Sequence, residues 1–586
     1  MYGEHSCSPA LAYHTMHTTQ FRRPLAYCYP HSFMTDEVSS DTRGARIVFA
    51  SALTIALAQL FWFGSKTIHE IDYDGMAYTG IARHLKLGEF HASINAFRSP
   101  LMSWIIALLP AVDNHLVLPG KLVNIVSYLT CFFLLYAFTK RLWGSSTVAS
   151  VAVLLFSFAR GWASVAVGAV VPDFLFAAIV LAYFVVLLGC IRRDDNRGWA
   201  YLGCLHGVAY LAKAFALPWL ALCTALAVLL STGSWKKRTQ RLAFAAIVPL
   251  LAALAWGTVL HSKYGVFTTG TQLKTNLLQW TLHAYDAHHD SSYLLLRDTT
   301  LDTDEFTVDD PMPPHSWPWT YALKPSKVFP KILLAERHNL PLFLKEILIV
   351  VTPGALLAWL AMSCIVLSNW SHYAQEALVA AVIAIAAASL ALAYSMLVFD
   401  MRYLFPLAPL LLALAARFLV PTTQWNHRGL RKICTLLAIM GAFTCLVYSS
   451  SPFRRITRDR QLSCYAAALR LSAHSPSTSG SRTLVSIGAG PFPESGVGWE
   501  AGYKTAFFAG YRVVAAREAL PTVALFPSLG TDLRKASPAA ILLWGRPGDA
   551  TYNSLADYLA QHYPTEPFEK INDPVLGEVG TAFFEK

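Results

Sequence analysis

Long apolar runs separated by short polar stretches occupy most of this chain, and their lengths predict the elements they form. A helix needs about 20 mainly apolar residues to cross a bilayer, and about eleven runs come close to that length. We expect membrane-spanning helices at 46–64, 119–139, 144–166, 172–191, 199–214, 216–232, 241–260, 342–368, 375–397, 402–420 and 431–449. The run at 99–112 is shorter, and we expect it to lie flat or re-entrant at the outer surface.

Basic residues between these runs predict the orientation of the chain. The connections "TKRLWG", "IRRDDNRG", "SWKKRTQR" and "NHRGLRK" all carry Lys or Arg. Cytoplasmic loops are enriched in these residues, so we expect the N-terminus inside. Three long segments then face outside, at 65–118, 261–341 and 450–586.

The chain therefore divides into three expected parts. Residues 1–45 lack the apolar core of a signal peptide, and we expect a disordered cytoplasmic tail, with Met34 as an alternative start. Residues 46–450 form the transmembrane domain. Residues 451–586 form a small α/β domain outside, because "RTLVSIG" and "AAILLWG" predict strands and "TYNSLADYLAQHY" predicts an amphipathic helix. The expected fold class is an α-helical polytopic membrane protein with this C-terminal α/β domain.

Composition agrees with a protein that lies mostly in lipid. The chain is 55% hydrophobic and 14% charged, whereas soluble domains carry about 25% charged residues. The net charge of +11 is explained by the basic cytoplasmic loops, so we expect no nucleic-acid partner. The cysteines show no paired spacing typical of zinc.

Alternating acids stand at the edge of the membrane in "HEIDYDG", where Glu70, Asp72 and Asp74 follow the first apolar run. The next residues, 75–87, predict an amphipathic surface helix with Asp74 at its N-cap and Gly88 just past its end. Asp74 could serve as a cap alone, and the other two acids could be solvated. The functional alternative is a general base for a substrate delivered by the membrane.

The order of motifs around this stretch resembles the integral-membrane GT-C glycosyltransferases. "DYDGMAYTGIARHLKLGEF" followed by "FRSPLMSWIIALL" is similar to the first external loop of the branch with protein O-mannosyltransferases and lipid A aminoarabinose transferases. In contrast to the aminoarabinose branch, no acid precedes Pro100. The resemblance covers roughly residues 45–450 and implies a GT-C-like transmembrane domain of about eleven helices.

The resemblance also implies site residues. Asp74 would be the catalytic base, Asp72 a second candidate, and Asp173 the acid of a second acidic site in "VVPDFLF". The matched segments add substrate-binding residues: Tyr78, Lys213, Lys274, Arg402 and Tyr403.

Charge near the membrane supports these assignments independently. Asp173, Lys213 and Arg402 fall near the outer ends of expected helices, where ionisable residues are costly and usually functional. The alternatives are snorkelling and an internal ion pair. A leaving phosphate needs cations, which Lys213, Arg402 and also Arg98 could supply.

The expected function is transfer of a monosaccharide from a polyprenyl-phosphate donor to an acceptor hydroxyl, with inversion, on the periplasmic face of a bacterial inner membrane. The acceptor could be a lipid, a glycan or a protein. One alternative is a transporter or flippase, although the sequence shows no internal repeat of that class. A second, enzymatic alternative is an oligosaccharide ligase or polymerase. We assign no metal ligand, because the histidines and acids of "HAYDAHHDSS" are more typical of a polar loop. We also assign no cofactor, and a requirement for a divalent metal stays open.

Overall fold

The computed structural model describes residues 42–276 (apart from His69, Asn114, Arg160, 193–195 and Thr232), 325–351, 374–396 and 400–420. In the C-terminal region it describes the helices and strands given below and residues 464–469, 471–472, 502, 504–509 and 533. Several predictions lie outside these residues: the tail at 1–41, the loop at 277–324 with its histidines, and the span at 431–449.

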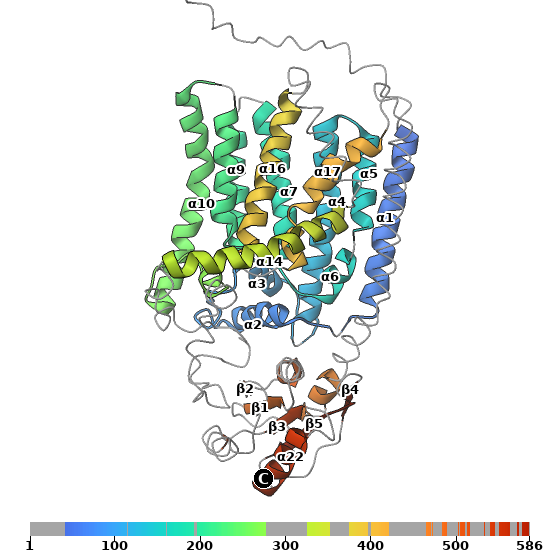
Figure 1. Ribbon diagram of the computed structural model, residues 1–586, viewed down its shortest axis with the longest axis vertical. Coiled ribbons are helices and arrows are strands. Elements are labelled where there is room, and N and C mark those ends of the chain that lie inside the picture. The colour runs from blue at the N-terminus through green and yellow to red at the C-terminus, as the bar shows by residue number, and fades with distance from the viewer. Residues whose placement is uncertain are drawn as a thin grey trace, which may run out of the picture.

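Apolar helices pack side by side into one bundle (Figure 1). Its members include α1 (Thr42–Gly64), α4 (Val117–Trp143), α7 (Asp173–Arg192), α8 (Asn196–Ala212), α9 (Ala216–Leu230), α10 (Trp235–Tyr264) and α16 (Ala374–Ser395). Four of the described helices, α1, α4, α7 and α10, are each long and apolar enough to cross a membrane. Exposed apolar residues such as Phe61 and Leu250 cover the outside of the bundle, as lipid contact requires. The prediction of a multi-pass, mainly helical membrane protein is therefore confirmed.

Two expected helices are each divided in the structure. The expected span at 144–166 consists of α5 (Ser146–Ser157) and α6 (Trp162–Gly168), bent by 59°. Gly161 between them has φ 76°, a left-handed conformation that glycine adopts without strain. The expected helix at 402–420 begins instead as a 3₁₀ turn, η3 (Met401–Leu404), followed by α17 (Ala408–Leu419). Pro406 favours this interruption, because proline has no N–H to donate to the hydrogen bonds of a continuous helix.

The prediction of a spanning helix that begins at 342 is wrong. Residues 342–351 belong to α14 (Pro325–Val351), which lies across the bundle rather than along it (Figure 1). Residues 352–368 lie outside the described part of the chain. The first half of α14 carries Lys331, Glu336 and Arg337 between exposed apolar residues, a pattern typical of an interfacial helix.

The first external segment forms a lid of short helices over one end of the bundle. The amphipathic helix α2 (Tyr73–Leu87) lies flat there, beside α3 (Leu101–Leu108) (Figure 1). Gly88 ends α2 with φ 79°, and its N–H bonds back to the carbonyls of His84 and Leu85, as expected from the sequence. Helix α3 has only eight residues, so the run at 99–112 does not span the bilayer as a helix.

A mixed sheet lies beyond α2 at the same end of the molecule (Figure 1). Its order is β2-β1-β3-β5-β4, formed by β1 (Thr483–Gly488), β2 (Arg512–Ala515), β3 (Ala540–Trp544), β4 (Ile571–Asp573) and β5 (Gly577–Phe584). β1 pairs parallel with β2 and β3, and β5 pairs antiparallel with β3 and β4. Helix α22 (Ala550–His562) follows β3. β1, β3 and α22 occur where the sequence predicts them, whereas the sequence did not predict β2.

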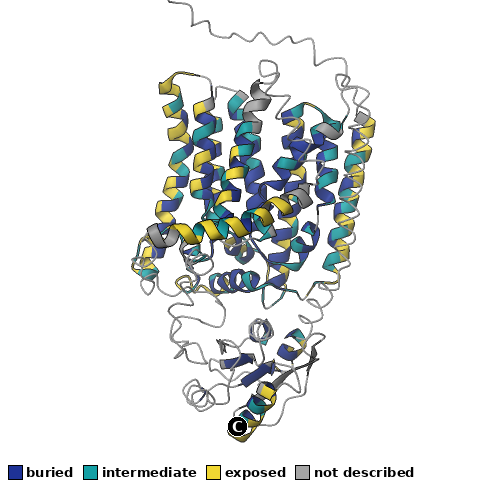
Figure 2. Cartoon of the chain, in the orientation of Figure 1, coloured by how far each residue is buried: buried dark blue, intermediate teal, exposed yellow. Residues whose placement is uncertain are grey.

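The C-terminal region contacts the segment that carries the acids. Phe507 is buried against Ile71, Met76 and Val117, and Phe508 packs beside them. The ring of His115 lies 5.3 Å from the ring of Phe507 and 5.7 Å from that of Phe508. Burial, aided by the charge of Arg83, lowers the pKa of His115 to about 4, so this imidazole is neutral at pH 7. Figure 2 shows that buried residues also continue from the bundle into α2.

Candidate active site

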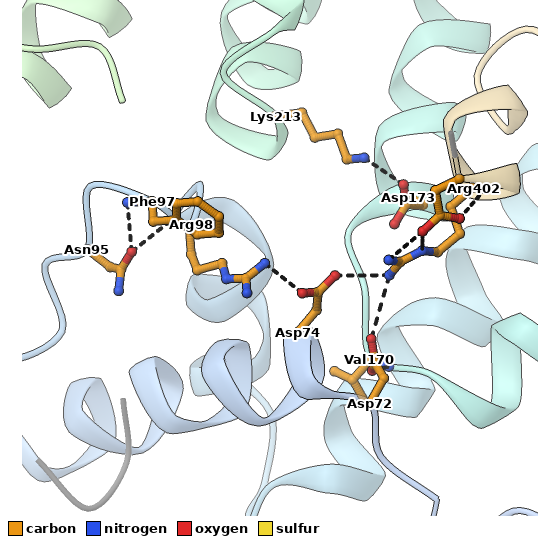
Figure 3. Close-up of polar contacts among 10 residues, drawn as sticks. Asp72, Asp74, Asn95, Phe97, Arg98, Val170, Asp173, Lys213 and Arg402 are labelled. Atoms are coloured by element: carbon orange, nitrogen blue, oxygen red, sulfur yellow. Dashed lines mark hydrogen bonds and ion pairs between the residues drawn. The ribbon is translucent and has the colours of Figure 1, made fainter. Parts of the chain in front are cut away.

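Asp74 lies in the first turn of α2 and is held between two arginines (Figure 3). Its Oδ1 is 2.8 Å from Nη1 of Arg98, and its Oδ2 is 2.9 Å from Nη1 of Arg402. The N-cap of α2 is Asp72, so the prediction that Asp74 caps this helix is wrong. Capping alone therefore does not explain Asp74, and its carboxylate is a candidate for chemistry.

Asp72 faces the same cluster from the turn before the helix. Its Oδ1 accepts a hydrogen bond from the backbone N–H of Val170 at 3.0 Å, and its Oδ2 lies 3.6 Å from Nη1 of Arg402. Asp72 is therefore not the solvated loop acid that the sequence left open. This contact ties the start of α2 to the connection that precedes α7.

Arg98 and Arg402 reach Asp74 from distant parts of the chain. Arg98 follows Asn95, whose Oδ1 accepts hydrogen bonds from the backbone N–H groups of Phe97 and Arg98 at 2.9 and 2.7 Å. Arg402 comes from η3, where Asp400 Oδ2 accepts hydrogen bonds from its Nε at 2.9 Å and its Nη2 at 2.8 Å. Asp400 Oδ1 also accepts one from the backbone N–H of Arg402.

Burial and the two arginines have opposite effects on these acids. Burial raises the pKa of Asp74, but the charges and hydrogen bonds of Arg98 and Arg402 outweigh it and lower that pKa to about 2. Burial, together with the neighbouring charge of Asp74, raises the pKa of Asp72 despite attraction to Arg402. The paired carboxylates thus differ strongly in proton affinity, and Asp74 is ionised at pH 7.

A second ion pair lies beside this cluster. Nζ of Lys213, at the end of α8, is 2.6 Å from Oδ1 of Asp173 at the start of α7. The same ammonium lies 5.5 Å from the ring centre of Tyr403, which stacks on Tyr394 at 4.0 Å. The internal ion pair that the sequence left open for Lys213 and Asp173 is therefore present.

Tyr78 and Lys274 are the other residues that the sequence predicted for the site. Tyr78 is buried on α2, its carbonyl accepts a hydrogen bond from Ser103, and burial raises its pKa to about 12. The guanidinium of Arg98 lies 5.8 Å from its ring centre. Lys274 lies in α11 (Gln272–Asn276), but its side chain is outside the described part.

Two residues of the cluster were missed by the sequence analysis. Asp400 holds Arg402, and Asn95 shapes the turn that carries Arg98. Both contacts are local, within three positions of the arginine, so an Asx signal before each arginine could have revealed them. Among the described residues, no three His, Cys, Asp or Glu side chains are grouped so as to hold a metal ion.

The geometry brings together three cations, Arg98, Lys213 and Arg402, and four carboxylates, Asp72, Asp74, Asp173 and Asp400. Such a site can accept a proton from a hydroxyl and stabilise negative charge on a departing group. It lies at the end of the bundle covered by α2, where the ends of α7 and α8 meet η3 (Figure 3).

Part of the chain is similar to known sequences. Residues 97–256 match the family model described as dolichyl-phosphate-mannose-protein mannosyltransferase. Undecaprenyl phosphate-alpha-4-amino-4-deoxy-L-arabinose arabinosyl transferases of Pseudomonas paraeruginosa and Pseudomonas aeruginosa are each 26% identical to this chain over 200 residues. These matches cover 32% of this chain and 36% of each relative, so the chain spans about a third of the curated relatives' length.

Comparison with solved structures covers more of the chain. The apo oligosaccharyltransferase of Archaeoglobus fulgidus has a TM-score of 0.53 at 11% identity, covering 85% of this chain and 69% of that one. ArnT from Cupriavidus metallidurans bound to undecaprenyl phosphate has a TM-score of 0.50 at 14% identity, covering 92% of this chain and 98% of that one. The resemblance predicted from the sequence is therefore confirmed: residues 97–256 match the mannosyltransferase family model, and the chain has the fold of the integral-membrane GT-C glycosyltransferases.

Proposed function

We propose that this protein is a glycosyltransferase that moves a monosaccharide from a polyprenyl-phosphate donor to an acceptor hydroxyl. The observation that carries the proposal is Asp74, an ionised carboxylate held by Arg98 and Arg402 at the edge of an apolar bundle. A lipid-linked donor can reach this edge from the bilayer, and its phosphate meets cations there. The structure of ArnT bound to undecaprenyl phosphate, which shares the fold, supports a lipid phosphate as the donor group.

The proposed reaction is a single displacement. The acceptor hydroxyl attacks the anomeric carbon while Asp74 takes its proton. A bond forms between the acceptor oxygen and the anomeric carbon, and the bond from that carbon to the phosphate oxygen breaks. The electron pair leaves with the polyprenyl phosphate, whose added negative charge Arg98, Arg402 and Lys213 stabilise. One displacement inverts the configuration at the anomeric carbon.

The other predicted residues have supporting roles in this proposal. Asp173 orients Lys213, to which it is paired at 2.6 Å. Tyr78 and Tyr403 line the cation cluster and contact Arg98 and Lys213 through their rings. Lys274 remains a candidate contact to the substrate from the next external segment.

We propose that the site faces the periplasm of a bacterial inner membrane. The basic connections predict that the opposite end of the bundle is cytoplasmic, and α2 and the C-terminal sheet lie at the same end of the bundle (Figure 1). A reporter fused after Gly480 should be periplasmic, and one fused after Lys237 should be cytoplasmic. The reverse pattern would place the acids on the wrong side for this function.

The direct test reconstitutes the purified protein in vesicles with a panel of undecaprenyl-phosphate monosaccharides and a cell-envelope extract as acceptor. Release of undecaprenyl phosphate by wild type and its loss in Asp74→Asn are the expected results. Asp557→Asn, an exposed acid on α22, is the matched control and should retain activity. Normal release by a folded Asp74→Asn variant would exclude Asp74 as the base, and no release from any donor by wild type would exclude this donor class.

A further inference from the structure

The first two turns of α4 carry two buried polar side chains that the proposed reaction does not use. Lys121 is 5% exposed and Asn124 is fully buried. Burying an ammonium or an amide group costs free energy unless new hydrogen bonds replace those made with water. The contacts of these two side chains therefore indicate what they hold in place.

Lys121 holds the connection between α1 and α2, which carries Glu70 and Asp72. Its Nζ donates hydrogen bonds to the backbone carbonyl oxygens of Thr67 and Ile68, at 3.1 Å to that of Ile68. The negative charges of Glu70 and Asp72 attract the same ammonium group. Hydrogen bonds from a charged donor are strong, and two of them to consecutive carbonyls restrict the direction of the backbone. Lys121 thus fixes the path by which the chain enters α2.

Asn124 holds the connection between α6 and α7, which ends at Asp173. Its Nδ2 donates a hydrogen bond to the backbone carbonyl oxygen of Ala169 at 2.7 Å. Gly120, one turn earlier on α4, allows this connection to come close, because a Cβ at this position would lie 2.5 Å from Cγ1 of Val170. Helix α4 therefore meets the second connection with an amide donor and with a glycine that leaves room for it.

The two connections meet at Asp72. Its Oδ1 accepts a hydrogen bond from the backbone N–H of Val170 at 3.0 Å (Figure 3). Each side of this bond is attached to α4 a few residues earlier in the chain. Asp74 follows closely on the first connection and Asp173 on the second. The start of one helix therefore supports both acidic parts of the site.

We propose that Lys121 and Asn124 are positioning residues, which hold the carboxylate of Asp74 at its working distance from the pair of Lys213 and Asp173. This inference rests on the proposed function. Beyond its first turns, α4 is packed into the apolar core of the bundle, so it provides a firm support. The acceptor hydroxyl has to reach the base while the donor phosphate meets its cations, and a misplacement of about 1 Å can cost about a hundredfold in rate.

The test separates the rate of transfer from binding of the donor. Lys121→Met keeps the apolar stem but removes the charged donor, and Asn124→Leu replaces the amide by an apolar group of similar size. The two kinetic constants, kcat and donor KM, are measured at saturating acceptor with the undecaprenyl-phosphate sugar that wild type uses. A separate measurement of retained, labelled undecaprenyl phosphate counts the binding sites, and kcat is expressed per site.

In both variants kcat should fall about ten- to hundred-fold, while donor KM should change less than about threefold. The arginines that meet the phosphate keep their places, because Asn95 and Asp400 hold them from outside the two connections. The combined variant should lose less than the product of the two single losses, because both side chains act on the same contact. Lys140→Met is the matched control, an exposed lysine at the opposite end of α4, and it should retain the wild-type kcat.

The outcomes distinguish this inference from the proposed function. Variants that bind the lipid and transfer at the wild-type rate would overturn the positioning role alone. A loss of activity that only follows a loss of lipid-binding sites would show a purely structural role and would overturn it as well. Failure of wild type to transfer from any donor would instead refute the proposed function.

Discussion

Variants of the buried pair of Lys213 and Asp173 can distinguish a role of this pair in stability from a role in function. The side chain of Asp173 is 5% exposed and that of Lys213 is 14% exposed, with 2.6 Å between their charged atoms. Replacing Lys213 by Met keeps the apolar stem but leaves a buried carboxylate without its partner. Breaking a buried ion pair on one side costs about 3–5 kcal/mol, because the remaining charge is uncompensated. Lys213→Met should therefore lower the free energy of unfolding by about that amount.

Removing both charges should restore most of this loss. In Lys213→Met with Asp173→Asn no buried charge remains, and replacing a whole buried pair is often nearly neutral. We expect the double variant to unfold within about 1 kcal/mol of wild type. Tryptophan fluorescence during unfolding in one detergent gives both values, and the single Asp173→Asn variant completes the cycle. A stable single variant, or a double variant as weak as the single, would refute the reasoning.

The double variant with recovered stability then tests whether Lys213 binds the donor phosphate. A lost charge-assisted contact is worth about 1.5–3 kcal/mol, so its catalytic efficiency for the donor should fall about ten- to hundred-fold. The measurement is a titration with an undecaprenyl-phosphate sugar at saturating acceptor. An unchanged donor dependence in this stable variant would make the pair purely structural.

Three further variants and one pH series test the surroundings of the site. Asp72→Asn should stabilise the protein at pH 7 more than at pH 4 in thermal unfolding, because the raised pKa of Asp72 makes its ionised form unfavourable in the fold. Asp400→Asn should free Arg402 and reduce transfer about tenfold, whereas Asp557→Asn should not. Phe507→Ala should lower kcat with little change in donor KM, and Phe507→Leu should restore it. As pH falls below about 6.5, stability should decline because the unfolded chain binds a proton that buried His115 resists, and His115→Gln should flatten this dependence.

Much of the bundle could be predicted from the sequence, because apolar runs of sufficient length have few alternatives in lipid. Helices α4, α7 and α9 occur close to their expected bounds. The exceptions have local causes that outweigh hydrophobicity. Gly161 divides the expected helix at 144–166, and charged residues along α14 make it lie across the bundle instead of spanning it. Hydrophobicity alone does not indicate the direction of a helix.

Most of the charged residues that the structure brings together were named from the sequence, but their pairings were not. The resemblance implied Asp74, Asp173, Lys213 and Arg402, and the place of the last three near the membrane surface supported it. Arg98 was named only as a further cation for the leaving phosphate. Which acid meets which base depends on packing between segments up to 328 positions apart, and no local pattern records that. The N-cap was misplaced by two residues for a similar reason, because Asp74 is drawn into the cluster.

The contact between the C-terminal region and α2 limits how this protein can be shortened. Phe507 and Phe508 cover Ile71, Met76 and Val117, which would otherwise face water beside the acids. A chain cut before residue 450 would keep the helical bundle but present this apolar patch to solvent. Such patches promote association between copies. Truncation would therefore yield a protein prone to aggregate rather than a minimal enzyme, and interpretable deletions should retain the helix at 504–509 and the sheet that carries it.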